Sequence, residues 1–274
     1  MNLDNKLNGI PAIYYINYDH HANRNEHMDR NLSNLKVNEY HRVSASKYTE
    51  NNLDEWKHLL LDIENYKLSF NTAGYSIICI QLLQNWLETT DDPYLIITKD
   101  TIDFGIIPYW HFDWNYLMEN IPYDWDCIQM GFENIQCIPF YLHPIMPAHT
   151  FGPSLINRHY AKKIVKLHHF DGQYKLTNYI ANMNFGGHSG TVDYFIGHNG
   201  KTYSLPLFPN NLEFFAKQTK KYNFVHATRL AYYDWWKCEK IKFSLDEFFN
   251  YGKPNDLAMI KKTSNYIPQY GFKK

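Results

Sequence analysis

The chain has 274 residues and a formal net charge of −1 with neutral histidines. Hydrophobic residues make up 45% of it, aromatic residues 17% and charged residues 20%, which excludes an intrinsically disordered chain and provides for a sizeable core. The balanced charge gives no reason to expect a nucleic-acid partner held by bulk electrostatics. We expect one α/β domain over residues 1–209 and a C-terminal extension over residues 210–274 that packs on it.

The cysteines and the apolar runs indicate in which cellular compartment the protein is expected. The four cysteines include no C-x-x-C pair, so neither a zinc site nor a disulfide framework is indicated, and Cys79 and Cys127 are expected to be reduced core residues. The longest apolar run, Ile77–Leu87, is interrupted by polar residues and is too short to span a bilayer. The sequence therefore predicts a cytoplasmic protein without a transmembrane segment.

The first part of the chain predicts the opening of an α/β unit. Pro11–Tyr18 is a strand candidate, and Met28, Leu32 and Leu35 follow it at helical spacing. Tyr40–Val43 is predicted to be a second, shorter strand. A strand, a polar turn, an amphipathic helix and a further strand are typical of a sheet that carries helices on its faces.

The middle of the chain contains the most apolar elements. Ala73–Glu88 is predicted to be a largely buried helix, and Tyr94–Thr98 a buried strand after it. Pro108–Asn120 is predicted to be an aromatic helix that begins at its proline. Two further strands are expected at Asp126–Met130 and at His149–Ile156.

The last part of the chain completes the expected core. Asn157–Leu167 predicts an amphipathic helix, and Val192–Ile196 and Thr202–Leu205 are expected to close the core. The aromatic segment Tyr222–Trp236 should pack on it, because it would otherwise expose a large apolar patch. The adjacent pair His168–His169 is a poor chelate, since neighbours do not share a face, and we expect both rings to be solvated.

Several strand candidates end in polar or small residues. Asn17, Tyr18 and Asp19 lie at the end of the first strand candidate, and Ser44–Ser46 follow the second. Lys99–Asp103 follow the strand Tyr94–Thr98, and Met130–Gly131 end the strand candidate after it. Where such strands run parallel, these ends form one rim, and an α/β sheet places its ligand there. Asp100 and Asp103 are then natural ligands of a divalent cation and of the phosphates that it carries, although two acids at a strand end can also simply cap and solubilise it.

Several segments resemble, in the same order, those of the family 25 glycosyltransferases, which include lipopolysaccharide and procollagen galactosyltransferases. They are, in chain order, IYYINYDHHANRNEHM, YHRVSA, DDPYLIITKDTIDF, SLINRHYAKKIV, TVDYF and TYSLPLF. Together they span residues 10–208. The resemblance implies a GT-A type fold, with a mainly parallel mixed sheet flanked by helices, that binds a nucleotide-diphospho-sugar, which we expect to be a UDP-sugar.

The resemblance also implies which residues contact the donor. Asn17 and Arg24 fall on the most characteristic positions of the first segment and would lie near the nucleotide. In the second segment a small residue lies against the nucleotide in the family. The residues implied there are Ser44, Ala45 and Ser46.

Further roles are implied for the metal and the acceptor. Asp100 would lie near a Mn²⁺ ion and the pyrophosphate. Asp193 would face the acceptor and is the candidate base that deprotonates its hydroxyl, although a cap of a helix or turn is an equally good role for it. His226, in the aromatic tail, would reach back as a ligand of the metal or of a phosphate, whereas a lone histidine there also fits a structural role.

The chain departs from the family at the metal motif. Where the family has Glu-Asp-Asp, this chain has Lys99, Asp100 and Thr101. An ammonium about 4 Å from a dication costs roughly 8 kcal/mol at an effective dielectric constant near 20, before screening. Either Lys99 holds the diphosphate without a metal, or its side chain turns away and Asp100 and Asp103 still hold Mn²⁺.

Two functions remain open at this point. The first is an inverting transferase that moves a hexose, such as galactose or glucose, from a UDP-sugar to a hydroxyl group of a glycan or protein acceptor. The second is a degenerate relative that binds a sugar, a nucleotide or a protein partner without turnover. The loss of two of the three acids in the metal motif favours the second, and the order of the segments favours the first.

Overall fold

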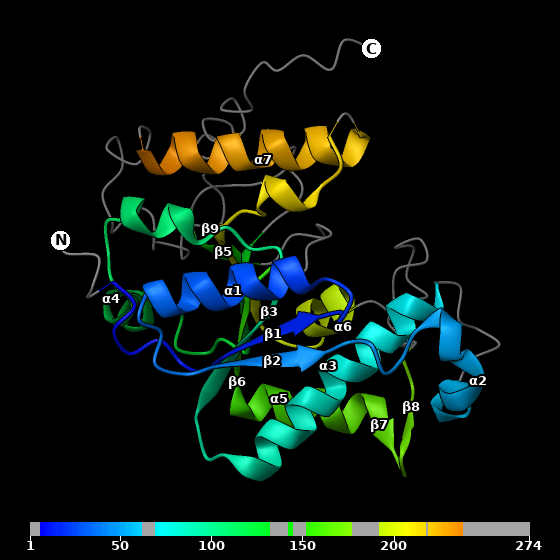
Figure 1. Cartoon of the computed structure of the whole chain (residues 1–274). Coiled ribbons are helices and arrows are strands. Elements are labelled where there is room, and N and C mark those ends of the chain that lie inside the picture. Colours follow the sequence, from blue (N-terminus) through cyan, green and yellow to red (C-terminus); the bar gives the residue numbers. More distant parts are fainter. Residues whose placement is uncertain are drawn as a thin grey trace.

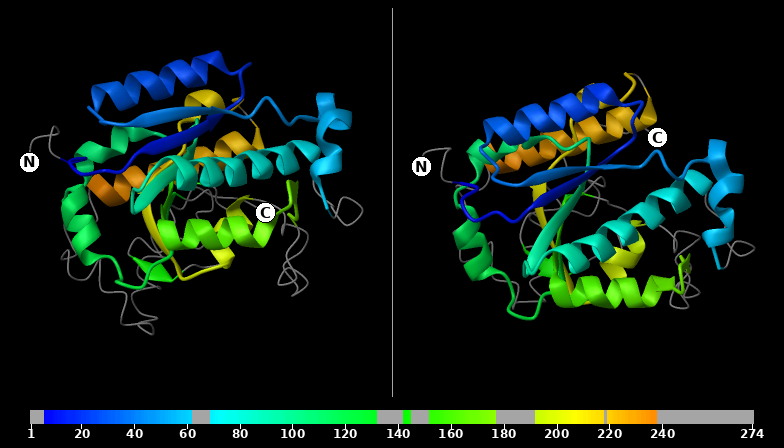
Figure 2. Two further views of the ribbon diagram at one scale, coloured as in Figure 1. Left: turned by 90° about the horizontal axis from the view of Figure 1, so that it is seen from below. Right: turned by 60° about the horizontal axis from the view of Figure 1, so that its bottom comes forward.

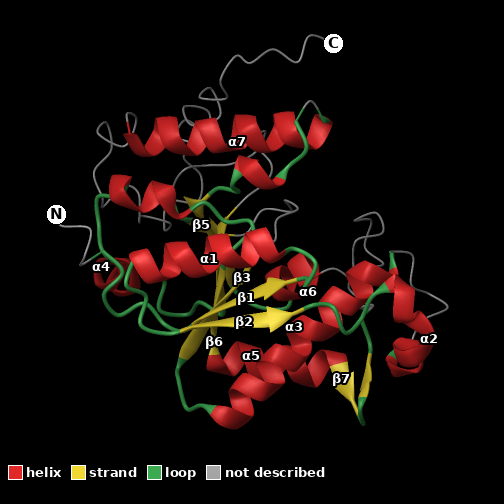
Figure 3. Ribbon diagram, viewed as in Figure 1, coloured by secondary structure: helices red, strands yellow, loops and turns green. Residues whose placement is uncertain are grey.

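A computed structural model describes the chain over residues 6–61, 69–131, 142–144, 152–176, 192–217 and 219–237. This part contains a seven-stranded mixed sheet with helices on both faces (Figures 1 and 3). The strands are ordered β2-β1-β3-β6-β4-β9-β5 across the sheet. In chain order they are β1 (Ile13–Asn17), β2 (Tyr40–Ser44), β3 (Tyr94–Lys99), β4 (Cys127–Gly131), β5 (His143–Pro144), β6 (Ser154–Asn157) and β9 (Thr202–Phe208).

The helices and a small hairpin complete the described structure. The hairpin consists of β7 (His169–Phe170) and β8 (Gln173–Tyr174). None of the described helices is both long and apolar enough to cross a membrane. In chain order the helices are α1 (Ala22–Asn34), α2 (Leu53–Trp56), α3 (Phe70–Thr89), α4 (Trp114–Asn120), α5 (Arg158–His168), α6 (Val192–His198) and α7 (Lys220–Lys237).

Five of the seven strands run in the same direction. β1 pairs in parallel with β2 and β3, and β4 pairs in parallel with β9. β6 is antiparallel to both β3 and β4, and β5 is antiparallel to β9. The expected α/β class, with a mainly parallel mixed sheet flanked by helices, is therefore confirmed.

The chain reverses its direction of travel across the sheet at β1. It passes from β1 through α1 to β2 on one side, and later through α3 to β3 on the other side. The two helices cover opposite faces, as Figure 2 shows: Met28 of α1 belongs to one core cluster, and Ile77 of α3 belongs to the other. Such a switch opens a crevice at the carboxyl ends of the two diverging strands, and ligands of open α/β sheets bind there.

Alternation along the strands supplies both cores. Ile13 and Tyr15 of β1 pack on the α1 face, whereas Ile16 packs on the α3 face, because successive strand side chains point to opposite sides. In β3, Leu95 and Ile97 face α3 while Ile96 faces α1. A sheet that is buried on both faces explains why these strands are apolar runs rather than alternating ones.

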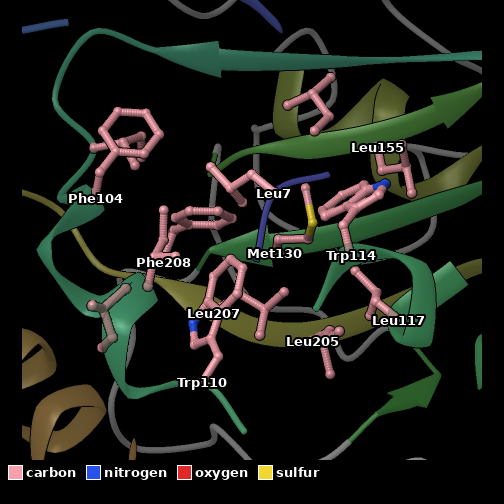
Figure 4. Packing of buried hydrophobic residues seen from close by; sticks show 14 of the residues in the cluster. Leu7, Phe104, Trp110, Trp114, Leu117, Met130, Leu155, Leu205, Leu207 and Phe208 are labelled. Carbon is pink, nitrogen blue, oxygen red and sulfur yellow. The ribbon is translucent and has the colours of Figure 1, made fainter. Parts of the chain in front are cut away.

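The core on the α1 face is rich in aromatic residues. Trp110, Trp114 and Phe208 pack there around Met130 and Leu155 (Figure 4). Helix α7 covers the same core through side chains that are almost completely buried. They are Tyr232, Trp235 and Trp236.

Three sequence predictions need correction or narrowing. The α-helix predicted from Pro108 begins at Trp114, because Asp113 caps it by accepting a hydrogen bond from Tyr116 N (2.9 Å), and Pro108 lies in a 3₁₀ helix, Phe104–Tyr109. The strand expected over residues 149–156 begins at Ser154 in the described part.

The segment Val192–Ile196 closes the core as expected, because Val192, Phe195 and Ile196 of α6 are buried on the α3 face. The third correction concerns a histidine. His168 is buried rather than solvated, because its ring bonds to Lys175 O (2.8 Å) and to Asn199 Nδ2 (3.2 Å). Cys79 and Cys127 are buried free thiols, as expected.

Candidate functional site

A cavity of about 660 Å³ opens at the carboxyl ends of β1 and β3, where the chain direction switches. Its described lining combines three cations, one carboxylate and several aromatic rings, contributed by segments far apart in the sequence. The described residues that line it are Ile16, Tyr18, Arg24, Asn71, Thr72, Tyr75, Ser76, Lys99, Asp100, Thr101, Val192, Phe214, Phe215 and Lys221.

The end of β1 is tied to the end of β3 by a buried polar contact. Asn17 Nδ2 donates a hydrogen bond to Asp100 Oδ2 (2.7 Å), and the Asn17 side-chain oxygen accepts one from Arg42 Nε (2.9 Å). The Asp100 side chain is only 8% exposed. Because one of its oxygens is already held by Asn17, the carboxylate has a fixed orientation at the cavity wall.

Arg24, in the first turn of α1, reaches the same carboxylate. Its Nη1 atom lies 3.5 Å from Asp100 Oδ1, and its Nη2 atom donates to Phe214 O (3.4 Å). The guanidinium carbon lies 5.5 Å from the centroid of the Phe214 ring. These contacts are all long, so the guanidinium is oriented by its neighbours while it still lines the cavity.

Lys99 enters the cavity from the other face of the sheet. It is the last residue of β3 and shares the α3 face with Leu95 and Ile97, by the two-residue period of a strand. The first turns of α3 lie on that face and contribute Thr72 and Tyr75 to the lining. The cavity therefore lies across the carboxyl ends of the strands, with Arg24 on the α1 face of the sheet and Lys99 on the α3 face.

Burial shifts the titration of two rings beside the cavity. Burial raises the pKa of the Tyr18 hydroxyl, and the Asp100 charge adds to this shift, so Tyr18 stays protonated at neutral pH. Burial lowers the pKa of His21, and the positive charge of Arg24 lowers it further. His21 is therefore predominantly neutral at pH 7.

The segment Pro209–Phe215, which we call the C-terminal strap, closes one wall of the cavity. Asp103 N donates to Pro209 O (2.9 Å), and the backbone N–H of residue 211 donates to Thr101 O (2.7 Å). Phe214 and Phe215 of the strap and Lys221 of α7 line the cavity. The domain boundary expected at residue 209 thus passes through the site, and sequence reasoning missed these three residues.

The side chains that line the cavity do not fit a Mn²⁺ ion. Asp100 is the one carboxylate among the described lining residues, and Asn17 and Arg24 already engage it. Across the described ranges, no group of three or more His, Cys, Asp and Glu side chains is arranged to hold a metal ion. Carboxylate-poor, cation-rich surroundings favour an anion instead.

Asp103 and His226 do not join Asp100 in a metal site. Asp103 Oδ2 accepts hydrogen bonds from Arg229 Nε (2.6 Å) and from the Tyr233 hydroxyl (3.1 Å), and its other oxygen caps the 3₁₀ helix at residue 105. His226 is exposed on α7, with its ring 5.9 Å from that of Tyr222. Neither lies among the described residues that line the cavity, so the structure does not bring the three predicted ligands together, and a metal-binding role for Asp100 stays a prediction.

Ser44, at the end of β2, and the two residues after it are not among the described residues that line the cavity. Ser44 Oγ donates to Asp19 Oδ1 (2.9 Å), and Ser46 Oγ accepts from Asp19 N (2.8 Å). Ala45 is fully buried in the core on the α3 face. These residues shape the loop after β1, and their predicted contact with the nucleotide stays a prediction.

The candidate base lies next to a residue of the cavity wall. Val192, the first residue of α6, lines the cavity, and Asp193 follows it in the helix. The side chain of Asp193 lies outside the described part of the structure. Its role as the base therefore stays a prediction.

Comparison with known proteins does not assign the chain to a family. No family model and no curated protein matches it. One solved structure, that of A197 from STIV, aligns with 73% of this chain and with 84% of its own chain, at 12% identity and a TM-score of 0.36. Similarity at this level carries no argument about function, which must come from the cavity itself.

Proposed function

We propose that the cavity binds a nucleotide-diphospho-sugar and that the protein is a glycosyltransferase of the family 25 type, with a GT-A fold. The observation that carries the proposal is the cation-rich cavity at the switch between β1 and β3. Open α/β sheets bind nucleotides at this position, and the three cations suit a diphosphate. The volume of about 660 Å³ lies within the range of small-molecule sites.

In this proposal the diphosphate is held by side chains rather than by a metal. A guanidinium such as that of Arg24 binds two phosphate oxygens at once, and Asp100 orients it from behind. The Lys99 ammonium is a compact point charge that suits a second oxygen. Negative charge that develops on the departing diphosphate is stabilised by the same two cations.

The aromatic walls suit the nucleoside. Tyr18, Tyr75 and Phe214 line the cavity from three different segments. A flat base gains from stacking on such rings, and ring hydroxyls can bond to its edge or to the ribose. These features support a nucleotide rather than inorganic pyrophosphate as the natural ligand.

Sugar transfer needs an acceptor and a base. The acceptor oxygen forms a bond to the anomeric carbon of the donor while the bond from that carbon to the diphosphate oxygen breaks, which inverts the configuration. The acceptor proton passes to a carboxylate, for which Asp193 is the candidate. Val192, its neighbour, lines the cavity, so an acceptor bound there would approach this end of α6.

Calorimetric titration tests the proposal. UDP, UDP-galactose and UDP-glucose are titrated into the protein in the presence of a chelator and again with Mn²⁺, and release of UDP is then followed with glycan and protein acceptors. We expect binding with the chelator and little gain from Mn²⁺. The absence of binding under both conditions, or binding only with Mn²⁺, would contradict the proposed site.

A second function is favoured by one observation. Asp100, the one carboxylate among the described lining residues, is held by Asn17 and Arg24 and so is poorly placed to accept a proton. A protein that binds the donor without turnover fits this arrangement. This non-catalytic function would be established over the transferase by two results together. The protein would bind the donor without releasing UDP over a broad acceptor panel, and the Asp193→Asn variant would bind the donor with the same affinity.

A further inference from the structure

We infer that Lys221, at the start of α7, binds the second phosphate of the ligand and makes the cavity selective for diphosphates over monophosphates. This inference rests on the proposed function of the same cavity, and it assigns to the C-terminal segment a part of the ligand that the strand ends do not hold. Lys221 lies 122 positions along the chain from Lys99, and nothing in its local sequence marks it as a ligand.

The side chain of Lys221 is directed to the cavity by an aromatic contact. Its Nζ atom lies 5.5 Å from the centroid of the Phe215 ring, and both residues line the cavity. Within the described ranges, no carboxylate forms an ion pair with Lys221. A cation held over an aromatic face but without an acidic partner is suited to an anionic ligand.

Arg24 and Lys221 each contact one of two adjacent aromatic rings of the strap. The Arg24 guanidinium lies 5.5 Å from the ring centroid of Phe214, and the Lys221 ammonium lies at the same distance from that of Phe215. The two rings leave the chain from adjacent positions, whose Cα atoms are about 3.8 Å apart. The two cations are therefore held by neighbouring residues of the strap without sharing a partner.

Two cations on separate residues of the cavity wall suit two linked phosphates. In this inference one phosphate binds to Arg24, next to Asp100, and a second phosphate extends the negative charge along the strap toward Lys221. Charge-assisted contacts to phosphate oxygens are among the stronger polar interactions. The contribution of Lys221 should therefore appear with a diphosphate and be small with a monophosphate.

The test compares ligands that differ by one phosphate. UMP, UDP and inorganic pyrophosphate are titrated by calorimetry, with a chelator present, into the wild-type protein, the Lys221→Gln variant and the Lys217→Gln variant. Lys217 is exposed, lies in the same connection between the strap and α7, and does not line the cavity, so it controls for the loss of one positive charge. Circular dichroism and thermal unfolding verify that each variant is folded.

We expect Lys221→Gln to weaken the binding of UDP by about tenfold or more and that of UMP by less than about threefold. Lys217→Gln should change neither. Equal losses for UMP and UDP, or full UDP affinity in Lys221→Gln, would overturn the inference and leave the proposed function standing. If the wild-type protein binds pyrophosphate through Lys221 but does not bind UDP, the nucleotide ligand of the proposed function is refuted and the diphosphate subsite is retained. If it binds neither, the proposed function and this inference are both refuted.

Discussion

The loop after β3 supplies two aspartates that each meet an arginine, and the two pairs differ in geometry. Asp100 lies 3.5 Å from Arg24 and lines the cavity, as does its arginine. Asp103 lies 2.6 Å from Arg229, and Tyr233 donates to the same oxygen (3.1 Å). The first pair is loose and opens onto a cavity, whereas the second is tight and joins the loop to α7.

The difference shows that an Arg–Asp pair is not in itself evidence of a binding site. Arg229 stacks over the Tyr233 ring, at 4.5 Å from its centroid, so its guanidinium has an aromatic and an acidic partner at short distance. The contacts of Arg24 are each longer than those of an ideal hydrogen bond. A ligand can therefore compete for Arg24 at small cost, but not for Arg229.

The largest expected difference between the two Arg–Asp pairs is the loss of ligand affinity when the arginine is replaced. Arg24→Gln should weaken UDP binding by about 10–100-fold, because charge-assisted hydrogen bonds contribute about 1.5–3 kcal/mol and each 1.4 kcal/mol is a factor of ten. Calorimetry measures it, with Arg30→Gln as the control, since Arg30 is exposed on the same helix. UDP affinity within about threefold of that of wild type would mean that Arg24 is structural.

Arg229→Gln should show the opposite behaviour. We expect the free energy of unfolding to fall by about 2 kcal/mol, because the partly buried Asp103 carboxylate loses its charged partner. For a chain of this size that lowers the melting temperature by roughly 4–8 °C. UDP affinity, measured well below that temperature, should change little. If Arg229→Gln greatly weakened UDP binding and left the free energy of unfolding unchanged, the Arg229–Asp103 pair would be the ligand-binding pair and not the structural one.

The smallest expected effect concerns pH and Tyr233. Burial raises the pKa of the Tyr233 hydroxyl, and the Asp103 charge raises it further, so the folded state retains this proton above the unfolded-state pKa of about 10. Its contribution to stability is complete below that pH and is lost as the pH rises through the folded-state pKa.

The measurement is urea unfolding of wild type and Tyr233→Phe at pH 7, 9 and 10.5. Tyr233→Phe is expected to be less stable at pH 7 by about 1 kcal/mol, the usual contribution of one hydrogen bond. The difference should shrink at the highest pH. Tyr123→Phe, at a tyrosine that is 95% exposed, is the control. A difference that stays constant with pH would show that the Tyr233 hydroxyl titrates normally.

The strand-end part of the site could be predicted from the sequence. Asn17 ends an apolar run and Asp100 follows one closely, and parallel pairing of β1 with β3 brings these strand ends together without further information. Lys99 is predicted in the same way. Arg24, in the first turn of α1, is implied only by the family resemblance. The fold class follows from the same alternation of strands and helices.

The remainder depends on contacts that no local pattern records. Phe214, Phe215 and Lys221 reach the cavity because the strap pairs with the loop after β3, at a separation of about a hundred residues. Asp100 and Asp103 are indistinguishable as acids in the sequence, and only the position of Arg229 on α7 decides that Asp103 is structural. Likewise, Pro108 starts no α-helix because Asp113 offers a better cap.

The late position of the strap in the chain has a consequence for synthesis. A ribosome that adds about 5–20 residues per second needs roughly 6–24 s to proceed from Thr101 to Lys221. During that interval the nascent chain already contains β1, α1 and β3, while the Trp235 and Trp236 side chains that cover the adjoining aromatic core have not been made. A nascent chain at this stage exposes aromatic surface and has no complete ligand cavity, so it is a natural client for chaperones. A ligand of the cavity would stabilise the protein only after α7 has docked.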